Sequence, residues 1–63
     1  MSRPSLPALK RLIAYSETWA IEYHLDGQFW SAERREGSTI RYLAGIDTAE
    51  LAALIDQAER GGS

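Results

Sequence analysis

Residues 19–25 alternate between large apolar side chains and small or polar ones. Alternation of period two is typical of a strand with one buried face. The Asp26-Gly27 dipeptide that follows is a favoured two-residue hairpin turn, because type I′ geometry needs a positive φ at both central residues. Pairing about this turn places the large apolar residues on one face, and it predicts these cross-strand partners: Leu25 with Gln28, Tyr23 with Trp30, Ile21 with Ala32, and Trp19 with Arg34. In the last pair, we expect the guanidinium group to stack on the indole ring.

A third strand is predicted over residues 38–44, after the turn residues Glu36-Gly37-Ser38. A three-residue turn sets Ala32 opposite Tyr42 and Glu33 opposite Arg41, so that apolar residues stay on one side and opposite charges pair on the other. A two-residue turn at Glu36-Gly37 would instead set Ala32 against Arg41. We therefore expect the three-residue turn.

The segment from Ile46 to Gly61 has the pattern of a helix that packs on the sheet. Asp47 is placed as N-cap with Glu50 three positions later, which is the spacing of a capping box, and Ile46 precedes the cap as a hydrophobic staple. Gly61 supplies a C-terminal stop. The predicted apolar stripe, at helical spacing, consists of Leu51, Leu54, Ile55 and Ala58.

A shorter helix is predicted near the N-terminus. Ser5 is placed to cap it, and Pro7 falls in its first turn, where a missing N–H costs nothing. Its predicted apolar side consists of Leu6, Leu9, Leu12 and Ile13. The fold class is therefore α+β, a three-stranded antiparallel meander with both helices on one face, in the order α-β-β-β-α.

Composition limits the size and setting of the domain. The 63 residues are 44% hydrophobic and 25% charged, as in an ordinary globular chain, and they predict one domain with an ordered core from about residue 5 to 60 and flexible ends. A chain this short buries only about 60% of the surface that its unfolded form exposes, so self-association would add to its stability. The sequence has no cysteine, no secretion signal and no apolar run long enough to span a bilayer, which favours a soluble cytoplasmic protein.

Few residues suggest catalysis or metal binding. Glu22, His24 and Asp26 are spaced by two on one strand and share a face, but alternate residues on a strand lie roughly 7 Å apart, which is too far for tight coordination. No third group is placed to orient the histidine, and no nucleophile elbow or phosphate-binding glycine motif is present. We therefore predict no enzyme activity, no metal site and no cofactor.

The order of motifs resembles a group of small stand-alone proteins of high-GC Gram-positive bacteria and their mobile elements. The resemblance covers residues 6–60 and rests on a short Leu-rich helix, W-x-I, a D-G turn, F-W-S-A-x-R-R and T-A-E-L-A-A-L-I. It implies a fold and a setting, and it assigns no site residues. The three strands and helix are also similar to the arm-binding N-terminal domains of tyrosine recombinases, whose open sheet face enters a DNA groove.

The predicted open sheet face suggests a protein-interaction or regulatory module. The face lacks a helix to cover it, and Phe29 and Leu43 would form an apolar patch there, as at the centre of an interface with a polar rim. We expect Phe29 to be the anchor, His24 its cross-strand neighbour, and Glu33 and Arg41 a rim pair. The predicted partner is a protein or a second copy of the chain.

The alternative function is DNA binding by the three-stranded sheet through Arg34, Arg35 and Arg41. The net charge of −2 disfavours nucleic acid, because such domains usually carry a basic excess that displaces counterions from phosphates. On the predicted open face, Arg35 and Arg41 would also lie beside the acidic residues Glu22, Asp26 and Glu33. A membrane partner is not expected.

Overall fold

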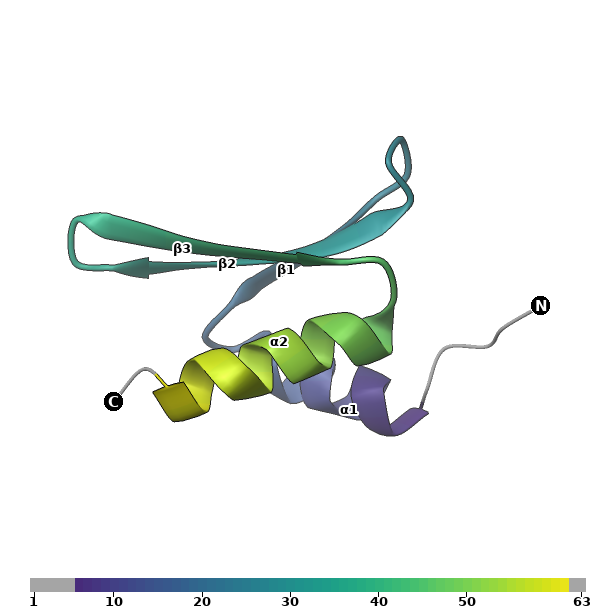
Figure 1. Cartoon of the computed structure of the whole chain (residues 1–63), viewed down its shortest axis with the longest axis horizontal. Coiled ribbons are helices and arrows are strands. Elements are labelled where there is room, and N and C mark those ends of the chain that lie inside the picture. Colours follow the sequence, from purple (N-terminus) through teal and green to yellow (C-terminus); the bar gives the residue numbers. More distant parts are fainter. Residues whose placement is uncertain (1–5, 62–63) are drawn as a thin grey trace.

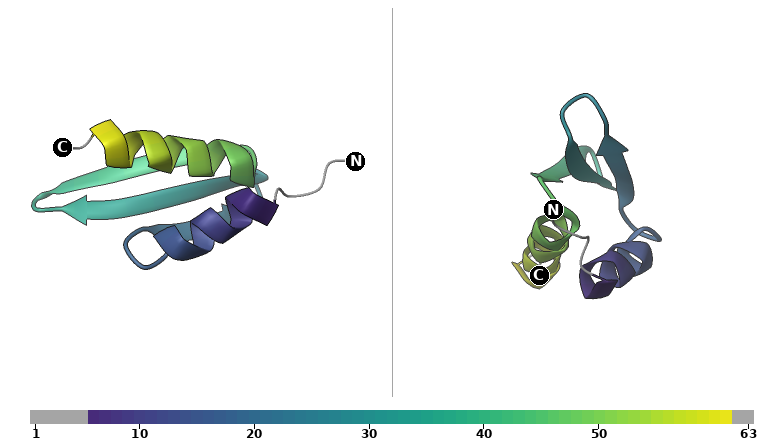
Figure 2. Two further views of the ribbon diagram at one scale, coloured as in Figure 1. Left: turned by 90° about the horizontal axis from the view of Figure 1, so that it is seen from below. Right: turned by 90° about the vertical axis from the view of Figure 1, so that its right-hand side faces the viewer.

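The structure is a computed structural model that describes residues 6–61, and it has two layers. A three-stranded antiparallel sheet with the strand order β1-β2-β3 forms one layer, and two helices on one face of it form the other (Figures 1 and 2). The order α-β-β-β-α and the α+β class are as predicted. The elements are α1 (Leu6–Tyr15), β1 (Ala20–His24), β2 (Phe29–Glu36), β3 (Thr39–Gly45) and α2 (Thr48–Gly61).

The core lies between the helices and the sheet. Its largest fully buried side chains are Trp19, Leu51 and Ile55, each at most 1% exposed. Ala8 and Ala52 are also buried, and such small side chains allow the two helices to approach closely. Tyr15, Ile21, Trp30, Leu43 and Ala58 are partly buried and pack around this core.

The buried faces of both helices differ from the predicted apolar stripes. On α2, Ala52 is buried and Leu54 is only half-buried. The reason is that α2 packs against α1 at its side as well as against the sheet. On α1, Leu12 is buried as predicted, whereas Leu6 and Ile13 are mostly exposed. Each helix therefore buries side chains that face the other helix as well as side chains that face the sheet. The apolar spacing along one helix does not predict this second buried side. The predicted cap Ser5 lies outside the described residues.

The first hairpin confirms the predicted register. Tyr23 pairs with Trp30 and Ile21 with Ala32. The predicted type I′ turn is wrong, because the positive φ in this loop, 55°, belongs to Gln28. The last pair is His24 with Phe29, so the loop has four residues. A two-residue and a four-residue loop give the same pairing, which is why the register was predicted correctly from an incorrect turn.

The second hairpin has a different register from the predicted one. Glu36 pairs with Thr39, so the loop is the two-residue Gly37-Ser38, with a positive φ of 65° at Gly37. A positive φ at the first central residue alone is the type II′ geometry, for which glycine is the usual residue. The shift of one residue turns every side chain of β3 to the other face.

This shift corrects the predicted faces of β3. Ala32 pairs with Leu43 and Glu33 with Tyr42. Leu43 packs against the core, whereas Tyr42 and Ile40 lie on the open face. The prediction placed Tyr42 in the core and Leu43 on the open face, and both placements are wrong.

The start of α2 is fixed by a glycine and a cap. A Cβ at Gly45 would lie 2.9 Å from the backbone nitrogen of Leu51, so this residue lets the helix approach the end of β3. The Asp47 carboxylate accepts a hydrogen bond from the Glu50 N–H at 2.8 Å, which confirms the predicted N-cap. The Glu50 carboxylate accepts from the Ile46 N–H at 2.7 Å. The side chain of Ile46 is 74% exposed and forms no staple.

Candidate interaction surface

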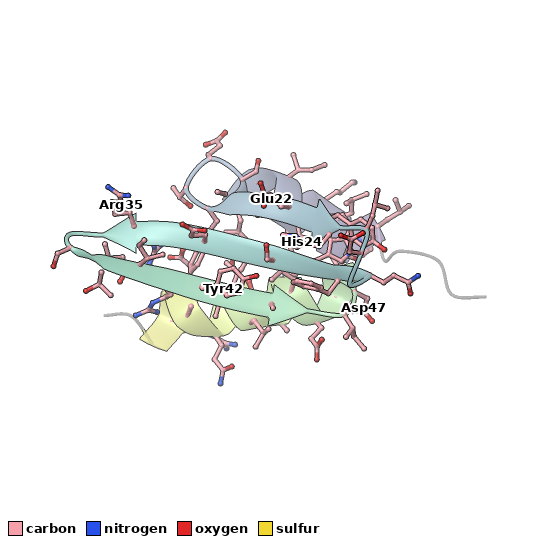
Figure 3. The ribbon with its side chains drawn as sticks, turned by 90° about the horizontal axis from the view of Figure 1, so that it is seen from above. Glu22, His24, Arg35, Tyr42 and Asp47 are labelled. Atoms are coloured by element: carbon pink, nitrogen blue, oxygen red, sulfur yellow. The ribbon has the colours of Figure 1, made fainter. Side chains whose placement is uncertain are left out.

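The sheet face opposite the helices is not covered by any other element of the described chain (Figures 1 and 3). In Figure 3 this face is seen from above, with Glu22 and His24 on β1, Arg35 on β2 and Tyr42 on β3. We call it the open face. The register places the following residues on it: Ala20, Glu22, His24, Phe29, Ser31, Glu33, Arg35, Ile40, Tyr42 and Ala44.

The apolar part of the open face runs along β3. Ile40 is 52% exposed and Tyr42 is 54% exposed, and Ala44 continues the same row toward the end of the strand. The corresponding residues of β1 and β2 are mainly polar or charged. Exposed apolar side chains in a row beside charged ones are the arrangement expected of a protein-binding surface.

Two charged side chains of the central strand lie beside this row. Glu33 is opposite Tyr42, and Arg35 is opposite Ile40. Both are exposed, and within residues 6–61 neither forms an ion pair or a side-chain hydrogen bond. Their charges are therefore available to a partner. The predicted pair of Glu33 with Arg41 is not formed, because these residues point to opposite faces of the sheet.

At the end of the open face near the β1–β2 loop, the polar and aromatic side chains contact one another. His24 Nε2 lies 2.7 Å from Ser31 Oγ, and the His24 ring stacks on Phe29 with ring centroids 4.5 Å apart. The Phe29 ring also covers Gly27, where an added Cβ would lie 2.6 Å from it. Phe29 is therefore half-buried within its own hairpin, and the large apolar side chains that are exposed on this face are Ile40 and Tyr42 instead. The predicted contact between Phe29 and His24 is present.

The residues considered for metal binding do not gather into a site. His24 Nε2 is 3.9 Å from the Glu22 carboxylate, and in the described range 6–61 no three His, Asp or Glu side chains are grouped to hold an ion. No helix in this range has both the length and the apolar composition to cross a membrane.

The three arginines considered for DNA binding are divided between the two faces. Arg35 is on the open face, whereas Arg34 and Arg41 point to the helix side. The guanidinium group of Arg34 lies 4.5 Å from the Trp19 ring centroid, which confirms the predicted stacking, and it donates to Glu59 at 2.8 Å. DNA binding by these residues stays a prediction, but the sheet does not present them as one patch.

Glu36 joins the two arginines of the helix side. Its carboxylate accepts hydrogen bonds from Arg34, including one from Nε at 3.0 Å, and lies 3.7 Å from Arg41. The hydrogen bond from Arg34, and to a smaller extent the positive charges of Arg41 and Arg34, lower the pKa of Glu36 below its ordinary value of 4.5. The same hydrogen bond raises the pKa of Arg34. This carboxylate allows two arginines to pair directly across β2 and β3.

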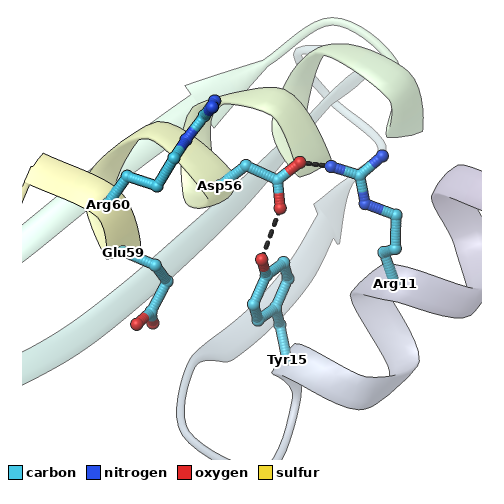
Figure 4. A pocket seen from close by; sticks show the side chains of 5 residues that line it. All are labelled: Arg11, Tyr15, Asp56, Glu59 and Arg60. Atoms are coloured by element: carbon cyan, nitrogen blue, oxygen red, sulfur yellow. Dashed lines mark hydrogen bonds and ion pairs between the residues drawn. The ribbon is translucent and has the colours of Figure 1, made fainter.

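A hollow of about 460 Å³ between the helices is lined by charged side chains and one tyrosine (Figure 4). The Asp56 carboxylate at its centre accepts a hydrogen bond from the Tyr15 hydroxyl and forms an ion pair with Arg11. Both carboxylate oxygens are therefore used by α1, and the cluster holds the two helices together. The hollow is lined by Arg11, Tyr15, Asp56, Glu59 and Arg60.

Comparison with known proteins adds no relationship: no family model, curated protein or solved structure matches the chain. The candidate surface therefore rests on the geometry of the open face. The sequence pattern did not identify Ile40 and Tyr42 as its apolar members. The signal that identifies them is the Gly37-Ser38 dipeptide, whose glycine favours a two-residue type II′ turn.

Proposed function

We propose that the protein is a small non-catalytic interaction module that binds through its open face, and that it self-associates by this surface. The observation that carries the proposal is the row of exposed apolar side chains along β3, with Tyr42 and Ile40 each more than half exposed. Charges of both signs on β2, at Glu33 and Arg35, flank the row, and neither has an ion-pair partner among residues 6–61. Apolar contacts would give affinity, and the charges would give orientation.

The size of the chain supports self-association. The chain has only 63 residues, and few of its side chains are fully buried. Covering the open face with a second copy would bury apolar surface without a further helix. The exposed Tyr42 also suits such a role, because tyrosine combines an apolar ring with a terminal hydroxyl and is enriched at interfaces where one end of the side chain is apolar and the other is wet.

The direct test is sedimentation velocity on the wild type and a Tyr42→Glu variant over a range up to roughly millimolar concentration. The wild type is expected to associate reversibly, and the variant is expected to remain monomeric because a carboxylate replaces the centre of the apolar row. Ile13→Glu is the matched control, since Ile13 is 63% exposed but lies on α1, away from the open face. This control should associate like the wild type.

Two results would contradict the proposal. A wild type that stays monomeric throughout would exclude self-association. Equal association of all three proteins would place the contact outside the open face. A gel shift with duplex DNA tests the alternative function separately: if DNA binding occurs, Arg35→Ala should weaken it and reduce its salt dependence by about one charge.

A further inference from the structure

The open face also has two neighbouring cross-strand rows, each made of one residue of β2 and its partner on β3, and the charged residues of the two rows have opposite signs. In one row Arg35 pairs with Ile40, and in the next row on the same face Glu33 pairs with Tyr42. Each row therefore holds one charged residue on the central strand and one apolar residue on β3. The rows differ in the sign of the charge, and the charged members have no ion-pair partner among the described residues.

We propose that two copies pack open face to open face about a two-fold axis that runs between the sheets, perpendicular to the strands and midway between these rows. This inference rests on the proposed function and adds the arrangement of the partner. The rotation exchanges the two rows. It therefore places Glu33 over Arg35 of the second copy and Ile40 over Tyr42 of the second copy, and each contact occurs twice.

Two different two-fold axes would place β2 of one copy over β2 of the other, one perpendicular and one parallel to the strands. The charges favour the perpendicular axis. A two-fold axis parallel to the strands would place Glu33 over Glu33 and Arg35 over Arg35 of the second copy. Like charges brought together across an interface are strongly unfavourable. The perpendicular axis instead places Glu33 over Arg35 and Tyr42 over Ile40, so that opposite charges meet and the two large apolar side chains of β3 meet.

The shape of the sheet is compatible with this packing. The loop between β1 and β2 rises above the open face at one end, away from the helices, whereas the Gly37-Ser38 end is clear (Figure 1). The proposed axis lies next to the clear end. The rotation places the raised loop of each copy beyond the Gly37-Ser38 turn of the other, so the loops do not obstruct the contact.

The contact is expected to be weak. Three short strands offer a small surface, and interfaces that bury less than about 1,200 Å² in total belong mostly to weak or transient complexes. A second copy of the chain matches this surface because the pattern is self-complementary in both charge and apolarity. A different partner would need to reproduce the same two rows by itself.

The test is the association of Glu33→Arg and Arg35→Glu variants, measured alone and mixed, by sedimentation velocity. Each variant alone is expected to associate at least about tenfold more weakly than the wild type, because both charge contacts become repulsive. In an equimolar mixture, one copy carries two arginines and the other two glutamates, so a heterodimer regains both contacts. The double variant Glu33→Arg, Arg35→Glu is also expected to regain them. Circular dichroism melting verifies that each variant is folded, and Glu33→Gln and Arg35→Gln replace any that is not.

Recovery in the mixture and in the double variant would support the proposed axis. Single variants that associate as the wild type would overturn it, and so would a mixture that does not recover. The proposed function has a separate criterion, the loss of association in Tyr42→Glu. If that loss occurs while the charge variants behave as the wild type, the open face is the contact and the two-fold arrangement is wrong.

Discussion

The two faces of the sheet are built from the same three strands but make different use of their side chains. On the helix side, Trp19 and Ala32 are fully buried, and charged residues form ion pairs within the chain. On the open face, Ile40 and Tyr42 are exposed, and Glu33 and Arg35 form no ion pair with any residue that the structure describes. On the helix side, apolar groups are therefore buried and charges are paired by other residues of the chain. On the open face, a partner could bury the apolar groups and pair with the charges.

This difference separates residues that determine stability from residues that determine binding. Arg34 and Arg35 are neighbours in sequence, yet the first contacts Trp19 and Glu59 and the second contacts no charged group in the described part of the chain. Substitutions on the helix side should therefore change the free energy of unfolding. Substitutions on the open face should change association and leave unfolding almost unaffected.

The largest expected effect is on the helix side, at Trp19. Trp19→Ala should lower the free energy of unfolding by about 3–5 kcal/mol, because the ring is 1% exposed and its removal leaves a cavity. Urea denaturation followed by circular dichroism measures this change. Ile55→Val is the milder companion if Trp19→Ala does not fold, with an expected loss of about 0.5–1.5 kcal/mol. A melt of Trp19→Ala that resembles the wild type would contradict the position of the core.

The next effect concerns the junction of β3 and α2. Gly45→Ala should destabilise the fold by about 1–3 kcal/mol, because the added Cβ would lie 2.9 Å from the backbone nitrogen of Leu51 and force the helix to shift. Thermal melting measures it. Gly61→Ala is the matched control, since an added Cβ there meets no atom within 4 Å. Equal melting temperatures for the two variants would show that α2 is not held this closely.

A smaller effect is the dependence of stability on pH through Glu36. Its pKa is lower in the folded chain than its ordinary value of 4.5, so the unfolded chain binds more protons between these two values. The stabilising contribution is fully present above pH 4.5 and is lost as the pH falls through the folded pKa. Urea midpoints measured from pH 6 downward should therefore decrease less steeply for Glu36→Gln than for the wild type. Parallel curves for the two proteins would show that Glu36 does not contribute.

The smallest effect on stability is expected on the open face. Tyr42→Thr and Ile40→Thr keep a residue that favours strands and remove only exposed apolar surface, so each should change the free energy of unfolding by no more than about 0.5 kcal/mol. The same urea experiment measures it. A loss as large as that of Ile55→Val would mean that the open face contributes to the core of the monomer.

The sequence predicted the element order and the first hairpin but not the second. Alternation in residues 19–25 has one solution that buries Trp19 and Ile21, so an incorrect turn still led to the correct register. In β3 both faces carry apolar residues, Leu43 on one and Tyr42 on the other, and the pattern alone does not determine which is buried. The type II′ turn at Gly37-Ser38 decides it. The candidate site therefore depended on a turn, and its apolar members could not be predicted once that turn was assigned incorrectly.

The most direct measurement is the dependence of amide NMR chemical shifts on protein concentration. If the open face is the contact, raising the concentration should shift the amides of β2 and β3 around Glu33 and Tyr42, and the amides on the outer surfaces of α1 and α2 should not move. Shifts confined to the helices would contradict the proposed surface. An unchanged spectrum up to roughly millimolar concentration would contradict self-association itself.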